Sequence, residues 1–154
     1  LLETKKRTAK KGPRAIQQDL MKKGIDKSLQ QEVLKQYSYE DQIQNAKDLA
    51  EKLVRAGDKQ TPAQVKQKIQ DLLMRKGYSF DVVSEVLDQM DITRNDDEWN
   101  HLIAKQGDKI WSKYQSKFTG SQLHMKVKQA LYQKGFPVEV INRFIEEKGQ
   151  EDGE

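Results

Sequence analysis

The stretches LMKKGI (Leu20–Ile25), LMRKGY (Leu73–Tyr78) and LYQKGF (Leu131–Phe136) are three versions of one phrase. Each has a leucine, a bulky apolar residue, two polar residues of which the second is lysine, a glycine, and another bulky apolar residue. Glycine adopts the left-handed backbone conformation that commonly ends a helix and turns the chain back. The phrase therefore predicts the same helix ending at three places.

The residues around these phrases also repeat. Alignment of Gly24, Gly77 and Gly135, which are 53 and 58 residues apart, brings the apolar positions on both sides into register. These positions are Ile16, Ile69 and Val127; Leu20, Leu73 and Leu131; Leu29, Val82 and Val140; Val33, Val86 and Phe144; and Leu34, Leu87 and Ile145. Their spacing within each copy is that of an amphipathic helix rather than a strand. We interpret the pattern as an internal repeat.

Each phrase is predicted to form a helix–turn–helix corner. The apolar residue after the glycine (Ile25, Tyr78 or Phe136) can pack back on the last helical turn. Asp26 and Ser79 are expected to cap the next helix, and Pro137 suits a first helical turn.

The repeat length leaves room for a third helix in each copy, expected at Tyr39–Gly57 and Trp99–Phe118. The first copy keeps at most the end of such a helix, at Leu1–Thr8. The predicted fold is all-α, with tandem three-helix modules in an elongated stack that can curve. Its predicted parts are a partial first module at 1–38, a second at 39–91, a third at 92–148 and an acidic tail at 149–154.

Composition excludes several classes of protein. A mean hydropathy of −0.94, with 35% hydrophobic and 34% charged residues, suits thin modules better than one thick core. The chain has no cysteine and therefore no disulfide or thiolate chemistry, which fits a cytoplasmic protein. We find no signal peptide and no apolar run near the ~20 residues of a membrane span. Because the chain starts at Leu1 without an initiator methionine, we expect it to be part of a longer protein.

No set of residues resembles a catalytic or metal site. His101 and His124 are the only histidines, and they fall on different predicted helices. Asp96–Glu98 is interpreted as a helix start, where negative charge is favourable, rather than as a metal site. Neither a phosphate-binding loop nor a dinucleotide fingerprint is present. Trp111 is interpreted as core, and Trp99 as core or an exposed contact. We predict a non-enzymatic protein without cofactor or metal.

Charge is unevenly distributed along the chain. Leu1–Arg14 carries six basic side chains and one acidic, whereas Glu146–Glu154 carries five acidic and one basic. The helices before each glycine are basic, and the two later helices after a glycine, Ser79–Asp91 and Pro137–Glu147, are acidic. Lysines near helix ends can simply complement the helix dipole. Others lie nearer helix starts or middles and predict a basic stripe that binds a partner. The candidate binding residues are Lys10, Lys11, Arg14, Lys66, Lys68, Lys126 and Lys128.

Acidic second helices argue against sequence-specific reading of the DNA major groove, because phosphates would repel them. Two alternatives stay open: contact with a nucleic-acid backbone through the basic side, and binding to a protein that coats nucleic acid.

KKGPRAIQQDLMKKGI (Lys10–Ile25) resembles a phrase of the RecX family of recombination regulators, through Gly12, Pro13, Arg14, Ile16, Leu20, Lys23, Gly24 and Ile25. LLMRKGYSFDVVSEVL (Leu72–Leu87) is similar to the family's next module, and Gln122–Ile145 to the extra module of longer members. The family's first module has no counterpart in this sequence. Of the candidate binding residues, only Arg14 belongs to the family pattern; the others rest on charge.

The resemblance implies a non-enzymatic modulator of the RecA recombinase, active in recombination, DNA repair and the SOS response. Such a protein would lie as a monomer in the groove of the RecA–DNA filament and inhibit ATP hydrolysis and strand exchange. The alternative is a helical repeat protein that binds nucleic acid without sequence preference, through phosphates.

Overall fold

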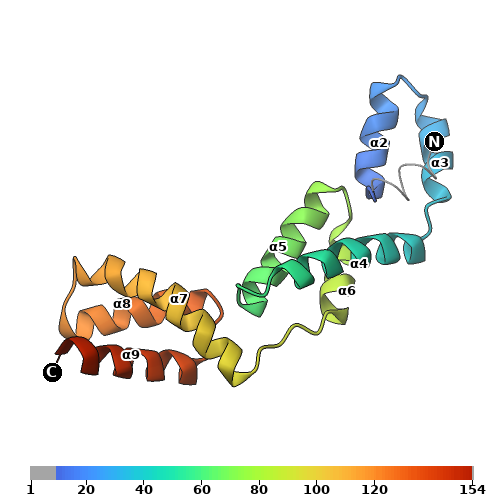
Figure 1. The fold of residues 1–154 in the computed structure, drawn as a ribbon. Helices are drawn as coiled ribbons and strands as arrows, with labels where there is room; N and C mark the ends of the chain where they lie inside the picture. The colour runs from blue at the N-terminus through green and yellow to red at the C-terminus, as the bar shows by residue number, and fades with distance from the viewer. Residues whose placement is uncertain (1–9, 154) are drawn as a thin grey trace. The chain divides into compact units, whose positions relative to one another are not determined.

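The computed structural model describes residues 10–153, and every regular element in that part of the chain is an α-helix (Figure 1). The helices are α2 (Pro13–Lys22), α3 (Lys27–Lys35), α4 (Tyr39–Ala56), α5 (Pro62–Arg75), α6 (Phe80–Gln89), α7 (Asp96–Gln115), α8 (Gly120–Gln133) and α9 (Val138–Gly153). The predicted all-α fold of tandem helical modules is confirmed. The expected helix end at Leu1–Thr8 lies outside the described residues.

The chain divides into two compact units. The first contains the described residues up to Ala56 together with Val65–Asp91, and the second contains Gly57–Gln64 and the chain from Ile92 onward. The module boundaries predicted at 38, 91 and 148 stay a prediction. α9 runs on to Gly153, so it includes most of the segment that we expected to be a separate acidic tail.

All three glycine corners form as predicted. Gly24, Gly77 and Gly135 have φ angles of 74°, 95° and 100°, in the left-handed region. At each corner the glycine N–H donates to a carbonyl three residues earlier, and the next N–H donates to the leucine carbonyl five residues earlier, at 3.0–3.3 Å. This pair of hydrogen bonds is the Schellman ending, in which the carbonyls of the last helical turn regain partners. The residue after the glycine is buried at the later corners, where Tyr78 and Phe136 are 0% and 2% exposed.

The predicted caps are partly correct. The Ser79 hydroxyl accepts a hydrogen bond from the Val82 N–H and caps α6. Asp26 stands at the N-cap position of α3, but its side chain makes no capping bond, so that prediction is wrong. Asp96–Glu98 does start a helix, and Asn95 forms a capping box with Glu98 at its head.

Not every aligned apolar residue is buried. Val82 and Val140, in the later copies, are at most 9% exposed, whereas their counterpart Leu29 is 53% exposed. In the described part of the chain α2 and α3 form a hairpin (Figure 1), and no third helix there covers the outer side of α3. The neighbouring Gln30 is buried instead, and its side-chain amide donates to the Ile25 carbonyl at 2.7 Å.

The second unit has one continuous hydrophobic core, built from α7, α8 and α9. Trp111 is 4% exposed, as predicted for a core residue. Trp99 is partly buried and packs against Phe136, with ring centroids 5.6 Å apart, which favours the core interpretation over an exposed contact. Gly107 allows α7 to approach α9, because a Cβ at that position would lie 2.7 Å from the Phe144 ring. In the described part of the chain, none of the helices has the length and apolar character needed to span a membrane.

Candidate partner-binding surface

The start of α2 is fastened to the glycine corner that ends α5. The Gly12 and Arg14 N–H groups donate to the Lys76 and Gly77 carbonyls at 2.7 and 3.0 Å. These donors and acceptors are groups that a helix end cannot pair within itself. The free N–H groups at the N-terminus of α2 are therefore paired with the free carbonyls at the C-terminus of α5. The helix dipoles favour this arrangement of N-terminus against C-terminus. We call this contact the first joint.

The first joint requires two glycines. A Cβ on Gly12 would lie 2.4 Å from the Gly77 carbonyl carbon, and one on Gly77 would lie 2.4 Å from the Ala15 nitrogen. Real Cβ atoms do not come so close to backbone, so both positions exclude larger residues. Gly77 thus serves the turn and the joint at once.

The corner that ends α8 also meets the start of a helix, here through a side chain rather than backbone N–H groups, and we call this contact the second joint. The Thr61 hydroxyl donates to the Lys134 carbonyl, and a Cβ on Gly135 would lie 2.6 Å from the Ala63 Cβ. Thr61 also heads α5, where it exchanges hydrogen bonds with Gln64 at 2.9 and 3.1 Å as a capping box.

Arg94 holds the loop that precedes this joint. Its guanidinium donates to the carbonyls of Gly57 and Gln60 at 2.8 and 2.9 Å. Since a guanidinium presents several donors in a rigid plane, one side chain fixes both carbonyls.

Neither joint was predicted from the sequence. The sequence feature that marks both joints is a proline at the first position of the helix whose N-terminus meets the glycine corner, Pro13 in α2 and Pro62 in α5. It was hidden because α2 has 10 residues and α5 has 14, so that alignment of the glycines leaves the prolines one helical turn out of register.

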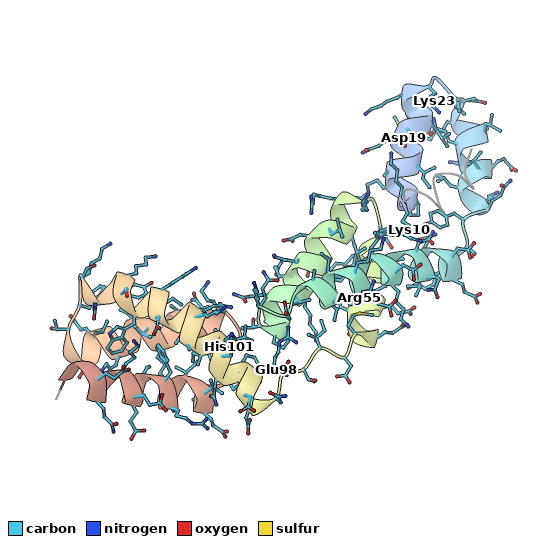
Figure 2. The ribbon with its side chains drawn as sticks, in the orientation of Figure 1. Lys10, Asp19, Lys23, Arg55, Glu98 and His101 are labelled. Atoms are coloured by element: carbon cyan, nitrogen blue, oxygen red, sulfur yellow. The ribbon has the colours of Figure 1, made fainter. Side chains whose placement is uncertain are left out.

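Two of the candidate binding residues directly precede the first joint in the chain, and both form ion pairs. Lys10 Nζ lies 3.3 Å from Asp48 Oδ2, and Lys11 Nζ lies 2.8 Å from Asp19 Oδ2. Figure 2 labels Lys10 and also Asp19, which lies on α2. Both lysine side chains are partly buried, at 23% and 32% exposed. Their charges are therefore balanced within the protein.

Two phenols hold the backbone of the same lysines. Tyr78 donates to the Lys10 carbonyl at 2.6 Å, Tyr37 donates to the Lys11 carbonyl at 2.9 Å, and the two hydroxyl oxygens are 3.3 Å apart. Lys10 has a φ of 50°, which L-residues rarely adopt. Burial, followed by the close Tyr37 hydroxyl, raises the pKa of Tyr78 above its ordinary value. Tyr78 thus stays protonated and remains a donor to the lysine backbone.

The other candidates are exposed. Arg14 on α2 and Lys66 and Lys68 on α5 form no ion pair in the described part of the chain. Lys68 lines a shallow hollow beside α4, together with Leu53, Asp71, Leu72 and Arg75. Arg14, Lys66 and Lys68 all belong to the first unit.

Lys126 and Lys128, in the second unit, point to different sides of α8. Lys126 Nζ lies over the Phe118 ring, 5.4 Å from its centroid, in a cation–π contact. Lys128 lines a groove with Tyr132 and Val138. Residues two apart on a helix do not share a face, which explains the divergence. Whether the seven residues bind a partner stays a prediction.

The two histidines do not form a site. Both are exposed, and the His124 ring packs near Trp111, with centroids 5.8 Å apart. Among the described residues, no three His, Cys, Asp or Glu side chains gather as metal ligands would.

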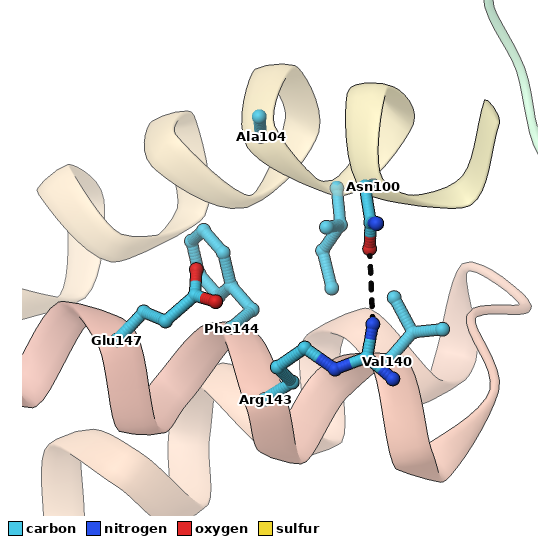
Figure 3. A pocket seen from close by; sticks show the side chains of 7 residues that line it. Asn100, Ala104, Val140, Arg143, Phe144 and Glu147 are labelled. Atoms are coloured by element: carbon cyan, nitrogen blue, oxygen red, sulfur yellow. Dashed lines mark hydrogen bonds between the residues drawn. The ribbon is translucent and has the colours of Figure 1, made fainter. Parts of the chain in front are cut away.

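A hollow of about 230 Å³ between α7 and α9 has mixed character (Figure 3). Arg143 donates to the Asn100 side-chain oxygen at 3.4 Å, and Glu147 and Phe144 line the other part. Its seven lining residues include neither histidine, serine nor threonine. This lining offers no pair of nucleophile and base.

Comparison with protein-family models identifies the kind of domain that repeats along the chain. The model of the RecX third three-helix domain matches residues 40–87, which cover almost all of α4–α6, and again residues 96–145, which cover α7, α8 and the first half of α9. The chain belongs to the RecX family. The model of the RecX second three-helix domain matches residues 1–34.

Curated RecX relatives align along almost the whole chain. Regulatory protein RecX of Bacillus licheniformis is 38% identical over 96% of this chain and 56% of its own length. The proteins of the same name from Oceanobacillus iheyensis and Bacillus subtilis are 37% and 36% identical, over 94% and 96% of this chain and 53% and 54% of their own lengths. The chain thus spans about half the length of the curated relatives that it matches. No solved structure matches it.

Proposed function

We propose that this chain is a regulator of the RecA recombinase that binds the groove of the RecA–DNA filament and inhibits ATP hydrolysis and strand exchange. The observation that carries the proposal is the family match, made separately by each of the two complete modules. The curated relatives are named regulatory proteins. The protein would act in the cytoplasm by binding alone, as a monomer, with no reaction of its own.

The exposed basic residues support contact with an anionic filament. Arg14, Lys66 and Lys68 present charge that no acidic side chain balances in the described part of the chain. We propose these three, together with Lys126 and Lys128, as contacts. Lys10 and Lys11, being paired internally, would position the start of α2 and hence Arg14.

The test is the single-stranded-DNA-dependent ATPase of RecA with this chain titrated in. We expect the rate of ATP hydrolysis to fall as the concentration of the chain approaches that of RecA. The double variant Lys66→Gln/Lys68→Gln should require about tenfold more protein, equivalent to ~1.4 kcal/mol of binding free energy. The control Lys105→Gln/Lys109→Gln removes the same charge from exposed positions of α7 and should inhibit like the unmodified chain.

Absence of inhibition by this chain, and equally by a longer polypeptide with a complete upstream module, would contradict the proposal. The same unpaired charge favours one second candidate, a binder of nucleic acid through phosphates. That function predicts tight binding to DNA without RecA, with a log–log salt slope of about −0.7 for each phosphate contacted on a single strand.

A further inference from the structure

Three large apolar side chains are exposed together on α8 and at the start of α9. Met125 is 60% exposed, Tyr132 is 64% exposed and Val138 is 43% exposed. With Lys128, Gln129 and the buried Ile141 they line a groove of about 210 Å³, which we call the α8 groove. Met125, Lys128, Gln129 and Tyr132 are spaced as one helix face, separate from the face that enters the core. A cluster of exposed apolar residues around a hollow is typical of a binding site.

The surroundings of the α8 groove are basic, which favours a negatively charged partner. Lys128 lines it and forms no ion pair among the described residues. α8 carries two lysines and no acidic residue, and another lysine, Lys134, follows it. The nearest carboxylate along the chain is Glu139, in the first turn of α9. A ligand that places an apolar group in the groove and negative charge beside α8 would match this surface.

The lining favours a protein side chain over a nucleobase. Although Lys128, Gln129 and Tyr132 carry polar groups, only apolar atoms line the hollow itself. The polar edges of an inserted base would therefore lose their hydrogen-bond partners there. A leucine or phenylalanine side chain has no such groups. The volume is below that of a typical small-molecule pocket and suits one anchoring side chain.

We propose that the α8 groove binds an acidic segment of a partner protein, which inserts one large apolar side chain between Tyr132 and Val138 beside Lys128. The inference rests on the proposed function for the identity of that protein, RecA, and assigns the third module a protein contact. The basic residues of the first unit would then be left for the DNA of the filament.

The test compares two binding measurements on the same variants. One is binding of the fluorescently labelled chain to RecA filaments formed on oligo-dT with a non-hydrolysable ATP analogue. The other is binding to the oligo-dT alone. We expect Met125→Ser, Tyr132→Ser and Lys128→Glu each to weaken filament binding about tenfold or more. The two serine variants should bind oligo-dT within about twofold of the unmodified chain.

Matched controls exist in the same chain. Met21 has the same exposure as Met125, 60%, but does not line the α8 groove, so Met21→Ser should bind filaments like the unmodified chain. Lys105→Glu places the same charge reversal on α7 and should also bind normally. Because all of these side chains are exposed, we expect each variant to fold, and circular dichroism checks this.

The outcomes separate the two claims. Filament binding that survives the groove substitutions overturns the α8 groove and leaves the proposed function standing. An equal loss of oligo-dT binding in the serine variants assigns the groove to stacking on DNA and overturns the protein contact. An unmodified chain that does not bind the filament at all overturns the proposed function, and the partner assigned to the groove with it.

Discussion

Gly77 and Gly24 occupy equivalent positions but carry different constraints. Both have left-handed φ angles, of 95° and 74°. A Cβ on Gly77 would strike the backbone of Ala15, whereas a Cβ on Gly24 would meet no described atom within 4 Å. Substitutions at these two positions therefore separate the free-energy cost of a left-handed residue in the turn from the cost of disrupting the first joint.

We predict that Gly24→Ala lowers the free energy of unfolding by ~1 kcal/mol, the cost of a left-handed L-residue. Gly77→Ala should cost at least ~2 kcal/mol more, because the new methyl group also forces α2 away from the corner. Urea unfolding followed by circular dichroism measures both. Equal costs would mean that the first joint contributes nothing to stability.

Tyr78 ties stability to pH through its hydroxyl. Burial and the close Tyr37 hydroxyl raise its pKa in the folded protein above the ordinary 10.0. The unfolded chain therefore loses this proton first as pH rises. The stabilising contribution is complete below about pH 10 and declines as pH rises toward the folded-state pKa.

We predict that Tyr78→Phe costs ~1–2 kcal/mol at neutral pH, because the Lys10 carbonyl loses its donor. Between about pH 9 and about pH 11 the variant should lose stability less steeply than the unmodified chain. Denaturant unfolding across this range tests both effects, with Tyr132→Phe as the exposed control. Parallel pH curves for Tyr78→Phe and the unmodified chain would show that Tyr78 does not set the alkaline slope.

At the scale of elements, the helix ends differ in how well they are capped. α7 begins with a complete capping box, in which Asn95 and Glu98 exchange hydrogen bonds of 2.8 and 2.9 Å. Thr119 stands at the N-cap position of α8, and its side chain makes no capping bond. Local sequence predicted the start of α7 at Asp96–Glu98, because negative charge accumulates there.

We predict that Asn95→Ala destabilises the second unit by ~1 kcal/mol, the usual value of an N-cap. Thr119→Ala should change stability by less than about half of that, because no side-chain bond is lost. Thermal unfolding of both variants decides the matter. An equal loss of stability at the two positions would show that the capping box at the start of α7 contributes no stability.

At the scale of the whole molecule, the division into two units predicts independent local stability. Leu73 and Leu131 are both fully buried, the former in the first unit and the latter in the second. Each Leu→Ala change should cost ~2–5 kcal/mol within its own unit.

Hydrogen exchange measured by mass spectrometry can locate the loss. Leu131→Ala should reduce protection in α7–α9 and leave α2–α4 and α6 near their original values, and Leu73→Ala should do the reverse. Loss of protection across both units from either change would show that the chain unfolds as one cooperative body.

Local sequence determined the helices and their corners. A Schellman ending is formed by hydrogen bonds within six consecutive residues, so LMKKGI, LMRKGY and LYQKGF specify it without help from the rest of the chain. The repeat and the family pattern also follow from residue spacing alone. These features are sufficient to predict helical modules and the RecX family pattern without reference to how the helices pack.

Tertiary structure alone decided what the individual charges and glycines do. Lys10 and Lys126 look alike as cations in the sequence, yet one is paired with Asp48 and the other lies over Phe118. Gly12 and Gly77 meet although they are 65 residues apart, and Thr61 bonds to Lys134 across 73. Contacts at such separations depend on how whole helices pack, and no local periodicity encodes that packing.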